Sequence, residues 1–192
     1  MVLDLAFYYA ILSAFIFSMA DFAGRFGVHK TNVFVGTTMT RGVASVILFV
    51  AIIVIGVEFP AFGPHYFWAM LAGICLPGLF SLLLLTSILK IGVSRAVPIK
   101  GCSPLFASFL AILFLGEEPT WYHLLGVIFV VSGVMLISFS PTKGVWKRRD
   151  IIWPISAAIV SGIGSVTWRY TMSIFKEPIA ATFIGTFSAF VL

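Results

Sequence analysis

The residues best suited to chemistry lie close together in one apolar segment, 97–115. Lys100 supplies a cation and Ser103 supplies a hydroxyl, while Pro104 has no backbone N–H and frees a carbonyl one turn earlier, near Lys100. In lipid, a freed carbonyl is tolerated only where protein or a water-filled cavity takes over its hydrogen bond. These residues predict a polar site beside the segment. The alternative is that Lys100, near the start of its helix, only anchors that helix to the headgroups.

A second group with useful chemistry is the run Trp168, Arg169 and Tyr170. It offers aromatic faces and a guanidinium, whose planar fork matches carboxylates and phosphates. We expect this run to complete a substrate site with Lys100, and the ligand that suits both is a small anionic or zwitterionic molecule. In the alternative interpretation, Arg169 anchors a helix end on the opposite membrane face.

Two further pairs of charged residues lie at predicted helix ends. Asp21 closes the first helix and Arg41 lies in the second, so both approach one membrane face and form a candidate polar pair. The alternative is that each extends separately to the interface.

Glu117 and Glu118 precede a helix start, where the helix dipole favours negative charge. A direct role of this acidic pair in coupling or gating is the other interpretation.

The other potential ligands and nucleophiles form no recognisable site. The three histidines share no metal-ligand spacing, and no phosphate loop or nucleophile elbow is present. Cys75 and Cys102 both fall inside predicted membrane spans, which favours buried free thiols. We therefore predict no catalytic residue, no metal and no cofactor, and the protein is not expected to be an enzyme.

The composition places these residues in a membrane. Of the 192 residues, 60% are hydrophobic and 10% are charged, whereas a soluble domain carries about 25% charged residues. The chain is therefore predicted to be an integral membrane protein in a lipid bilayer. Its net charge of +5 reflects basic residues near helix ends, so we predict no nucleic-acid partner. The first segment is not expected to be a cleaved signal peptide, because no basic residue precedes Arg25.

Apolar runs of the length that crosses a bilayer predict an all-α protein. Pro77 and Gly78 predict a kink in the third helix. A short basic linker, 142–150, separates five helices from a second region that begins with a helix over 151–168 and starts another near Ile179. The first five helices are expected at 5–24, 33–57, 66–89, 97–115 and 121–140.

One stretch of the chain, Thr86 to Ser140, resembles a known family. The residues that carry the resemblance are Ser94-Arg95-Ala96, Ser103-Pro104-Leu105-Phe106, Leu115-Gly116-Glu117, Gly126 and Gly133. In this order they resemble the EamA-type repeat of the drug/metabolite transporter superfamily. The resemblance implies a secondary transporter, or permease, that moves a small polar or amphipathic metabolite across the cell membrane by alternating access. It also allows a coupling ion, a proton or another, and a homodimer.

A weak internal repeat predicts a second copy of this family's repeat. A shift of about 146 residues places Asp4 on Asp150 and Lys30 on Lys176. We expect residues 1–141 to form a first EamA repeat and residues 151–192 to begin a second, inverted one. About seven of the ten transmembrane helices expected for a protein of about 290 residues would then be present.

Two other functions stay open at this point. A four-helix multidrug exporter needs a carboxylate deep in its first helix, whereas Asp21 lies near the end of that helix. A non-transporting structural subunit, or a membrane enzyme, is the other class, and the spans lack the clustered polar residues that an enzyme needs.

Two arguments on membrane orientation disagree. The loops after the first, third and fifth helices hold most of the basic residues, which places those loops in the cytoplasm and the N-terminus outside. The resemblance implies both chain ends inside.

A cysteine at Lys147, in a variant without Cys75 and Cys102, decides between them. The basic-residue count predicts that an impermeant thiol reagent added outside leaves this cysteine unlabelled. Labelling from outside intact cells would instead support the orientation that the resemblance implies.

Overall fold

The structure is a computed structural model that describes residues 5, 7–16, 19, 32–116, 118, 120–138, 147–175 and 177–192. The chain divides into two units, Met1–Gly36 and Thr37–Leu192. The first unit contains an apolar helix, Phe7–Ile16, and the start of α2 (Val33–Ile55). Asn32 begins α2, because its Oδ1 accepts a hydrogen bond from the N–H of Phe34 at 3.3 Å.

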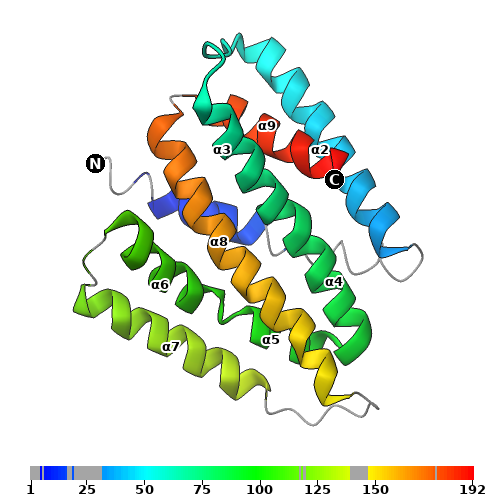
Figure 1. Cartoon of the computed structure of the whole chain (residues 1–192), viewed down its shortest axis with the longest axis vertical. Helices are drawn as coiled ribbons and strands as arrows, with labels where there is room; N and C mark the ends of the chain where they lie inside the picture. Colours follow the sequence, from blue (N-terminus) through cyan, green and yellow to red (C-terminus); the bar gives the residue numbers. More distant parts are fainter. Residues whose placement is uncertain are drawn as a thin grey trace. The chain divides into compact units, whose positions relative to one another are not determined.

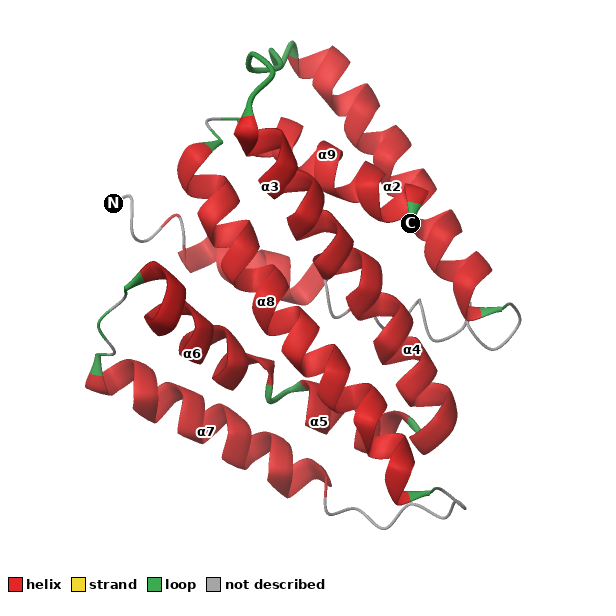
Figure 2. Ribbon diagram, in the orientation of Figure 1, coloured by secondary structure: helices red, strands yellow, loops and turns green. Residues whose placement is uncertain are grey.

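The second unit is built from helices throughout its described residues, which confirms the all-α prediction (Figure 2). Two short elements interrupt the α-helices: η1 is a π-helical turn and η2 is a 3-10 turn. After α2 the elements are α3 (Pro64–Gly73), η1 (Ile74–Leu79), α4 (Phe80–Ile91), α5 (Val93–Lys100), α6 (Ser103–Leu115), α7 (Trp121–Ser138), η2 (Arg148–Ile151), α8 (Ile152–Ile174) and α9 (Pro178–Val191).

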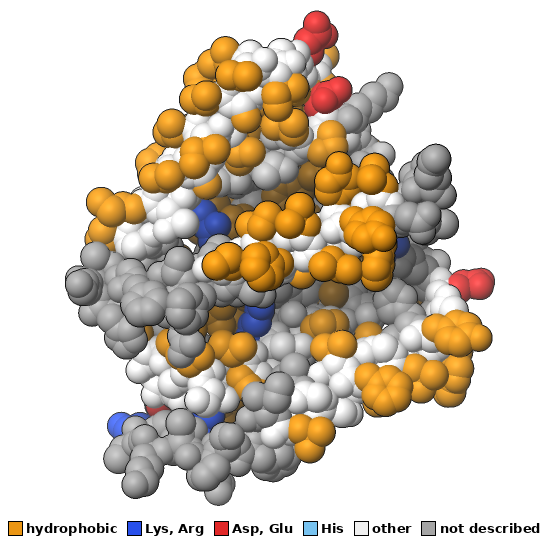
Figure 3. Space-filling view, turned by 180° about the vertical axis from the view of Figure 1, so that it is seen from behind, with side chains coloured by type: hydrophobic (Ala, Val, Ile, Leu, Met, Phe, Trp, Pro, Cys, Tyr) orange, Lys and Arg blue, Asp and Glu red, His pale blue; other side chains and the backbone are white. Residues whose placement is uncertain are grey.

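The helices have the length and surface of membrane spans. Among the described residues, four helices are long and apolar enough to cross a bilayer: Val33–Ile55, Pro64–Ile91, Val93–Leu115 and Arg149–Ile174. Three shorter apolar helices accompany them. Large apolar side chains point outward, and Figure 3 shows hydrophobic side chains predominating on one face, with lysine and arginine at few places. The chain is therefore a multi-pass membrane protein.

The span Pro64–Ile91 is broken near its middle, which confirms the predicted kink. Leu76 leaves the helical conformation, with φ −136° and ψ 105°, immediately before Pro77. Because Pro77 lacks an N–H and Leu76 is extended, helical hydrogen bonding is interrupted here. The indole Nε1–H of Trp168 donates to the carbonyl oxygen of Leu76 at 2.6 Å and so supplies one missing partner.

The span Val93–Leu115 is also broken, and it begins four residues before the predicted start at 97. The break lies at Gly101 and Cys102, between α5 and α6. The expected loop before this span shrinks to one residue, because Gly92 adopts φ +82° and joins α4 directly to α5. In the region after the basic linker, α8 extends to Ile174, whereas the helix was predicted to end at 168.

Helix α8 packs between the two broken spans, as Figure 1 shows, and contacts both. Its glycines permit this close approach. A Cβ on Gly162 would lie 2.7 Å from Cβ of Phe106 in α6, and one on Gly164 would lie 2.5 Å from Cβ of Leu76. Small residues at helix contacts let backbones come together, which is how membrane helices associate without a hydrophobic driving force.

Helix α9 packs on α3 through another glycine contact. A Cβ on Gly73 would lie 2.0 Å from the carbonyl oxygen of Gly185. Ala69, Ala180 and Ala181 are fully buried in the same contact region. This interface therefore excludes any side chain larger than hydrogen at position 73.

We expect Gly73→Ala to lower the stability of the detergent-solubilised protein by about 1–3 kcal/mol, because the added methyl forces two backbones apart. The measurement is thermal unfolding. Gly126→Ala in α7 is the matched control, since a Cβ there meets nothing within 4 Å, and it should cost nothing. Equal losses for the two variants would show that the α3–α9 contact is not close-packed.

Candidate functional site

Two cationic side chains reach the start of α4, directly after the break in its span. Arg41 of α2 donates a hydrogen bond from Nη2 to Oγ of Ser81. Lys100, the last residue of α5, places its Nζ 5.2 Å from the ring centroid of Phe80. Phe80 and Ser81 are the first two residues of α4, so the two cations converge on one turn of this helix.

Within the part of the chain that the structure describes, neither of these two cations forms an ion pair with an acidic side chain. The Nε of Arg41 is buried and has no hydrogen-bond partner among the described residues. The acidic residues that the structure describes lie in loops or at helix ends: Glu58, Glu118, Asp150 and Glu177. A cation within a membrane span is costly unless something compensates it. Cationic side chains at such a turn can donate charge-assisted hydrogen bonds to an anion.

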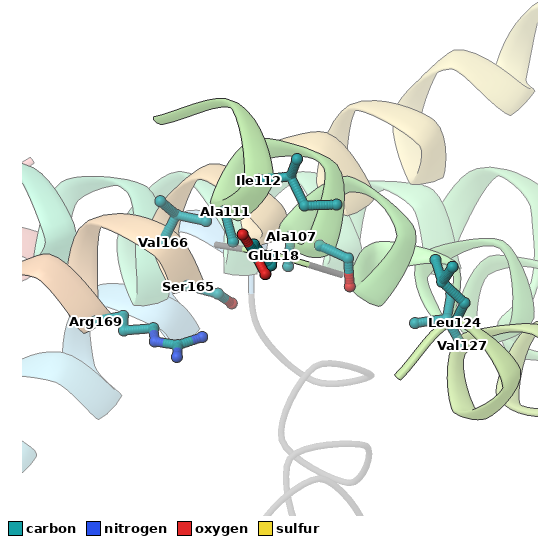
Figure 4. Close-up of a pocket in the computed structure, with 10 residues that line it drawn as sticks. Ala107, Ala111, Ile112, Glu118, Leu124, Val127, Ser165, Val166 and Arg169 are labelled. Atoms are coloured by element: carbon teal, nitrogen blue, oxygen red, sulfur yellow. The ribbon is translucent and has the colours of Figure 1, made fainter. Parts of the chain in front are cut away.

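A small pocket of about 150 Å³ lies between α6, α7 and α8. Figure 4 shows the side chains of Glu118, Ser165 and Arg169 at this pocket. The rest of the pocket wall is mainly apolar. The pocket therefore combines side chains of opposite charge and hydroxyl groups with an apolar surface. Its lining residues are Ala107, Ser108, Ala111, Ile112, Glu118, Leu124, Val127, Ser165, Val166 and Arg169.

The three consecutive candidates in α8 face different neighbours. Trp168 donates to the Leu76 carbonyl, Arg169 lines the pocket, and the ring of Tyr170 lies 5.0 Å from that of Trp68 in an edge-to-face contact. Successive residues of a helix point about 100° apart. The structure therefore does not bring this run together at one site, although its members were grouped by adjacency in sequence.

The other candidates lie around the second break. Ser103 and Pro104 begin α6 and are half-buried, directly after the Gly101–Cys102 turn that follows Lys100. They are not among the residues that line the α6–α8 pocket. The polar residues thus divide between the turn at the start of α4 and the pocket that contains Arg169.

The predicted pairing of Asp21 with Arg41 is untested, because Asp21 lies outside the described residues. The contact that the structure does give Arg41, with Ser81, was not anticipated from the sequence. Ser81 stands 40 residues further along the chain in an apolar helix, and no local pattern distinguishes it. Ser108 was missed for the same reason, whereas Glu118 was considered as a charge near a helix start or as a residue of coupling or gating.

Comparisons with known proteins agree with the membrane spans of the structure. A profile of the EamA-like transporter family matches residues 4–139. The chain belongs to this family. EamA-like proteins are transporters, so membership makes this chain a membrane protein of a transporter type and agrees with the spans described above.

Two curated relatives carry a more specific name. The chain is 39% identical over 57 residues to phosphoenolpyruvate/phosphate translocator 1, chloroplastic, from Oryza sativa subsp. japonica. It has the same identity over the same length to the protein of that name from Arabidopsis thaliana. Each match covers 30% of this chain and 14% of the relative, so the chain matches a small part of either translocator. No solved structure matches the chain.

The hydrogen bond from Trp168 to the Leu76 carbonyl generates a stability prediction. Trp168→Phe keeps an aromatic ring but removes the donor, leaving a carbonyl at the helix break without this partner. We expect a loss of about 1–3 kcal/mol in thermal unfolding, the cost of an unpaired buried polar group.

Trp121→Phe is the matched control, because Trp121 is 70% exposed at the start of α7. It should change stability by less than about 0.5 kcal/mol. A Trp168→Phe protein as stable as this control would show that another group satisfies the Leu76 carbonyl.

Proposed function

We propose that this protein is a secondary transporter that moves a small polar metabolite carrying a carboxylate or phosphate across the membrane by alternating access. The observation that carries the proposal is the convergence of Arg41 and Lys100 on the first turn of α4. Two cations on one turn inside the span region form a recognition element for an anion.

The broken spans support the same proposal. Transporters commonly build their sites where a transmembrane helix is discontinuous, because the break exposes backbone groups that bind substrate or ion. Here both breaks flank α8, and Lys100 immediately precedes one of them while Ser81 follows the other. Pro104 lies in the first turn of α6, where a missing backbone N–H costs no intrahelical hydrogen bond, so the break between α5 and α6 is compatible with this proline.

The names of the two relatives point to substrates of this chemistry. Phosphoenolpyruvate and phosphate are small anions, and phosphoenolpyruvate carries both a carboxylate and a phosphate. The similarity covers a small part of those proteins, so it supports the class of substrate and leaves its identity to measurement.

The direct test is transport by the purified full-length protein in liposomes. Vesicles loaded with unlabelled phosphate should accumulate labelled phosphate from outside, and external phosphoenolpyruvate should compete with it. Uptake that appears only with a pH or sodium gradient would identify ion coupling instead of exchange. Failure to move any small carboxylate or phosphate, with the protein folded and correctly inserted, would contradict the proposal.

Lys100→Gln should raise the substrate KM roughly tenfold or more, the loss expected when a charged hydrogen bond worth about 1.5–3 kcal/mol is removed. The readout is the KM of phosphate uptake at matched protein levels. Lys147→Gln is the matched control, because Lys147 is exposed beside η2 and distant in sequence from the breaks. Unchanged uptake by the Lys100→Gln protein would place the anion site elsewhere, with the Arg169 pocket next to be tested.

A further inference from the structure

One end of the helical bundle concentrates basic residues from three spans. Lys90 lies in the last turn of α4 and Arg95 in the first turn of α5, and only Gly92 separates the two helices. Arg149 lies in η2, which contacts α4 and leads directly into α8. The chain thus brings Lys90, Arg95 and Arg149 to the same end from segments about 55 residues apart.

An aromatic contact connects the two segments. The Nζ of Lys90 lies 4.7 Å from the ring centroid of Trp153, in a cation–π contact. Trp153 lies in the first turn of α8, and η2, which holds Arg149, immediately precedes this helix and contacts α4. Lys90 and Arg149 remain exposed despite these contacts.

The acidic residue described at this end is already engaged. The Oδ2 of Asp150 accepts a hydrogen bond from the backbone N–H of Lys147 at 3.1 Å and so begins η2. This carboxylate therefore acts as a helix cap. The described side chains at this end carry an excess of positive charge.

The position of the cluster along the spans identifies its surroundings. The candidate spans Pro64–Ile91, Val93–Leu115 and Arg149–Ile174 all begin or end here. The ends of membrane spans lie at the level of the phospholipid headgroups, where tryptophan is enriched and basic side chains meet phosphate. A soluble anion would have to compete at this depth with a dense layer of lipid phosphates.

We propose that Lys90, Arg149 and Trp153 form a binding site for the headgroup of an anionic phospholipid. The two cations contact the lipid phosphate, and the indole lies at the interface beside the start of the acyl chains. This site is separate from the turn at the start of α4 and does not depend on the transported substrate. It connects the end of the α3–α4 span to the start of α8, the helix against which both broken spans pack.

The test is a lipid titration of the detergent-solubilised full chain, followed by native mass spectrometry. Phosphatidylglycerol should bind more tightly than phosphatidylcholine. Lys90→Gln and Arg149→Gln should each weaken phosphatidylglycerol binding roughly fivefold, the equivalent of about 1 kcal/mol for one basic residue near a membrane surface. Lys90→Arg should retain binding, and phosphatidylcholine binding should not change.

Arg169→Gln is the matched control, since it removes one positive charge near the opposite end of α8. It should leave phosphatidylglycerol binding unchanged. An equal loss with this control, or equal affinity for the two lipids, would overturn the proposal by showing that only net charge matters. Displacement of phosphatidylglycerol by a tenfold excess of inorganic phosphate would assign the site to a soluble anion and overturn it as well.

Discussion

The arrangement of this protein depends on how polar backbone groups are satisfied inside apolar spans. A carbonyl in a membrane has no water to replace a missing helical partner, so each break in a span requires a donor from elsewhere in the protein. The indole of Trp168 supplies that donor to Leu76, 92 residues away along the chain. This hydrogen bond requires the middle of α8 to lie beside the break. The glycines of α8 then allow its backbone to approach both neighbouring spans.

The same break explains why polar residues gather at the start of α4. Where the regular helix is interrupted, α4 begins again with Phe80 and Ser81, and these two positions receive Lys100 and Arg41. Burying a charge in a span is unfavourable by several kcal/mol. The two cations that contact this turn are therefore the basis of the proposed anion site. Membership of the EamA-like transporter family is consistent with a substrate site within the spans.

The residues at the two ends of α8 have different chemistry. Near its C-terminal end, Arg169 shares a small pocket with Glu118, so opposite charges face a mainly apolar wall. At its N-terminal end, Arg149 and Trp153 lie beside Lys90, and the nearby carboxylate of Asp150 is occupied as a cap. The first arrangement contains a carboxylate as well as a guanidinium, whereas the second has an excess of positive charge at the end of the spans. A bilayer with anionic lipid in one leaflet distinguishes these two ends.

The sequence by itself determined the properties that depend on composition and local pattern. Its apolar runs required membrane helices, Pro77 required a break in the third span, and the order of residues around Ser103 and Pro104 resembled the EamA-type repeat. Those features are local because helix length, missing N–H groups and turn glycines act within a few residues. The predicted helix boundaries differed from those of the structure where a single residue connects two helices, as Gly92 connects α4 and α5.

Tertiary structure decided which candidates meet. Trp168, Arg169 and Tyr170 are adjacent in sequence, yet helical geometry directs them to a backbone carbonyl, a pocket and another aromatic ring. Arg41 contacts Ser81, 40 residues further along the chain, and no pattern in either helix alone identifies this pair. Contacts between distant spans arise from the packing of whole helix faces, and every apolar face of this chain has a similar composition. The pattern of one segment therefore cannot specify its partner.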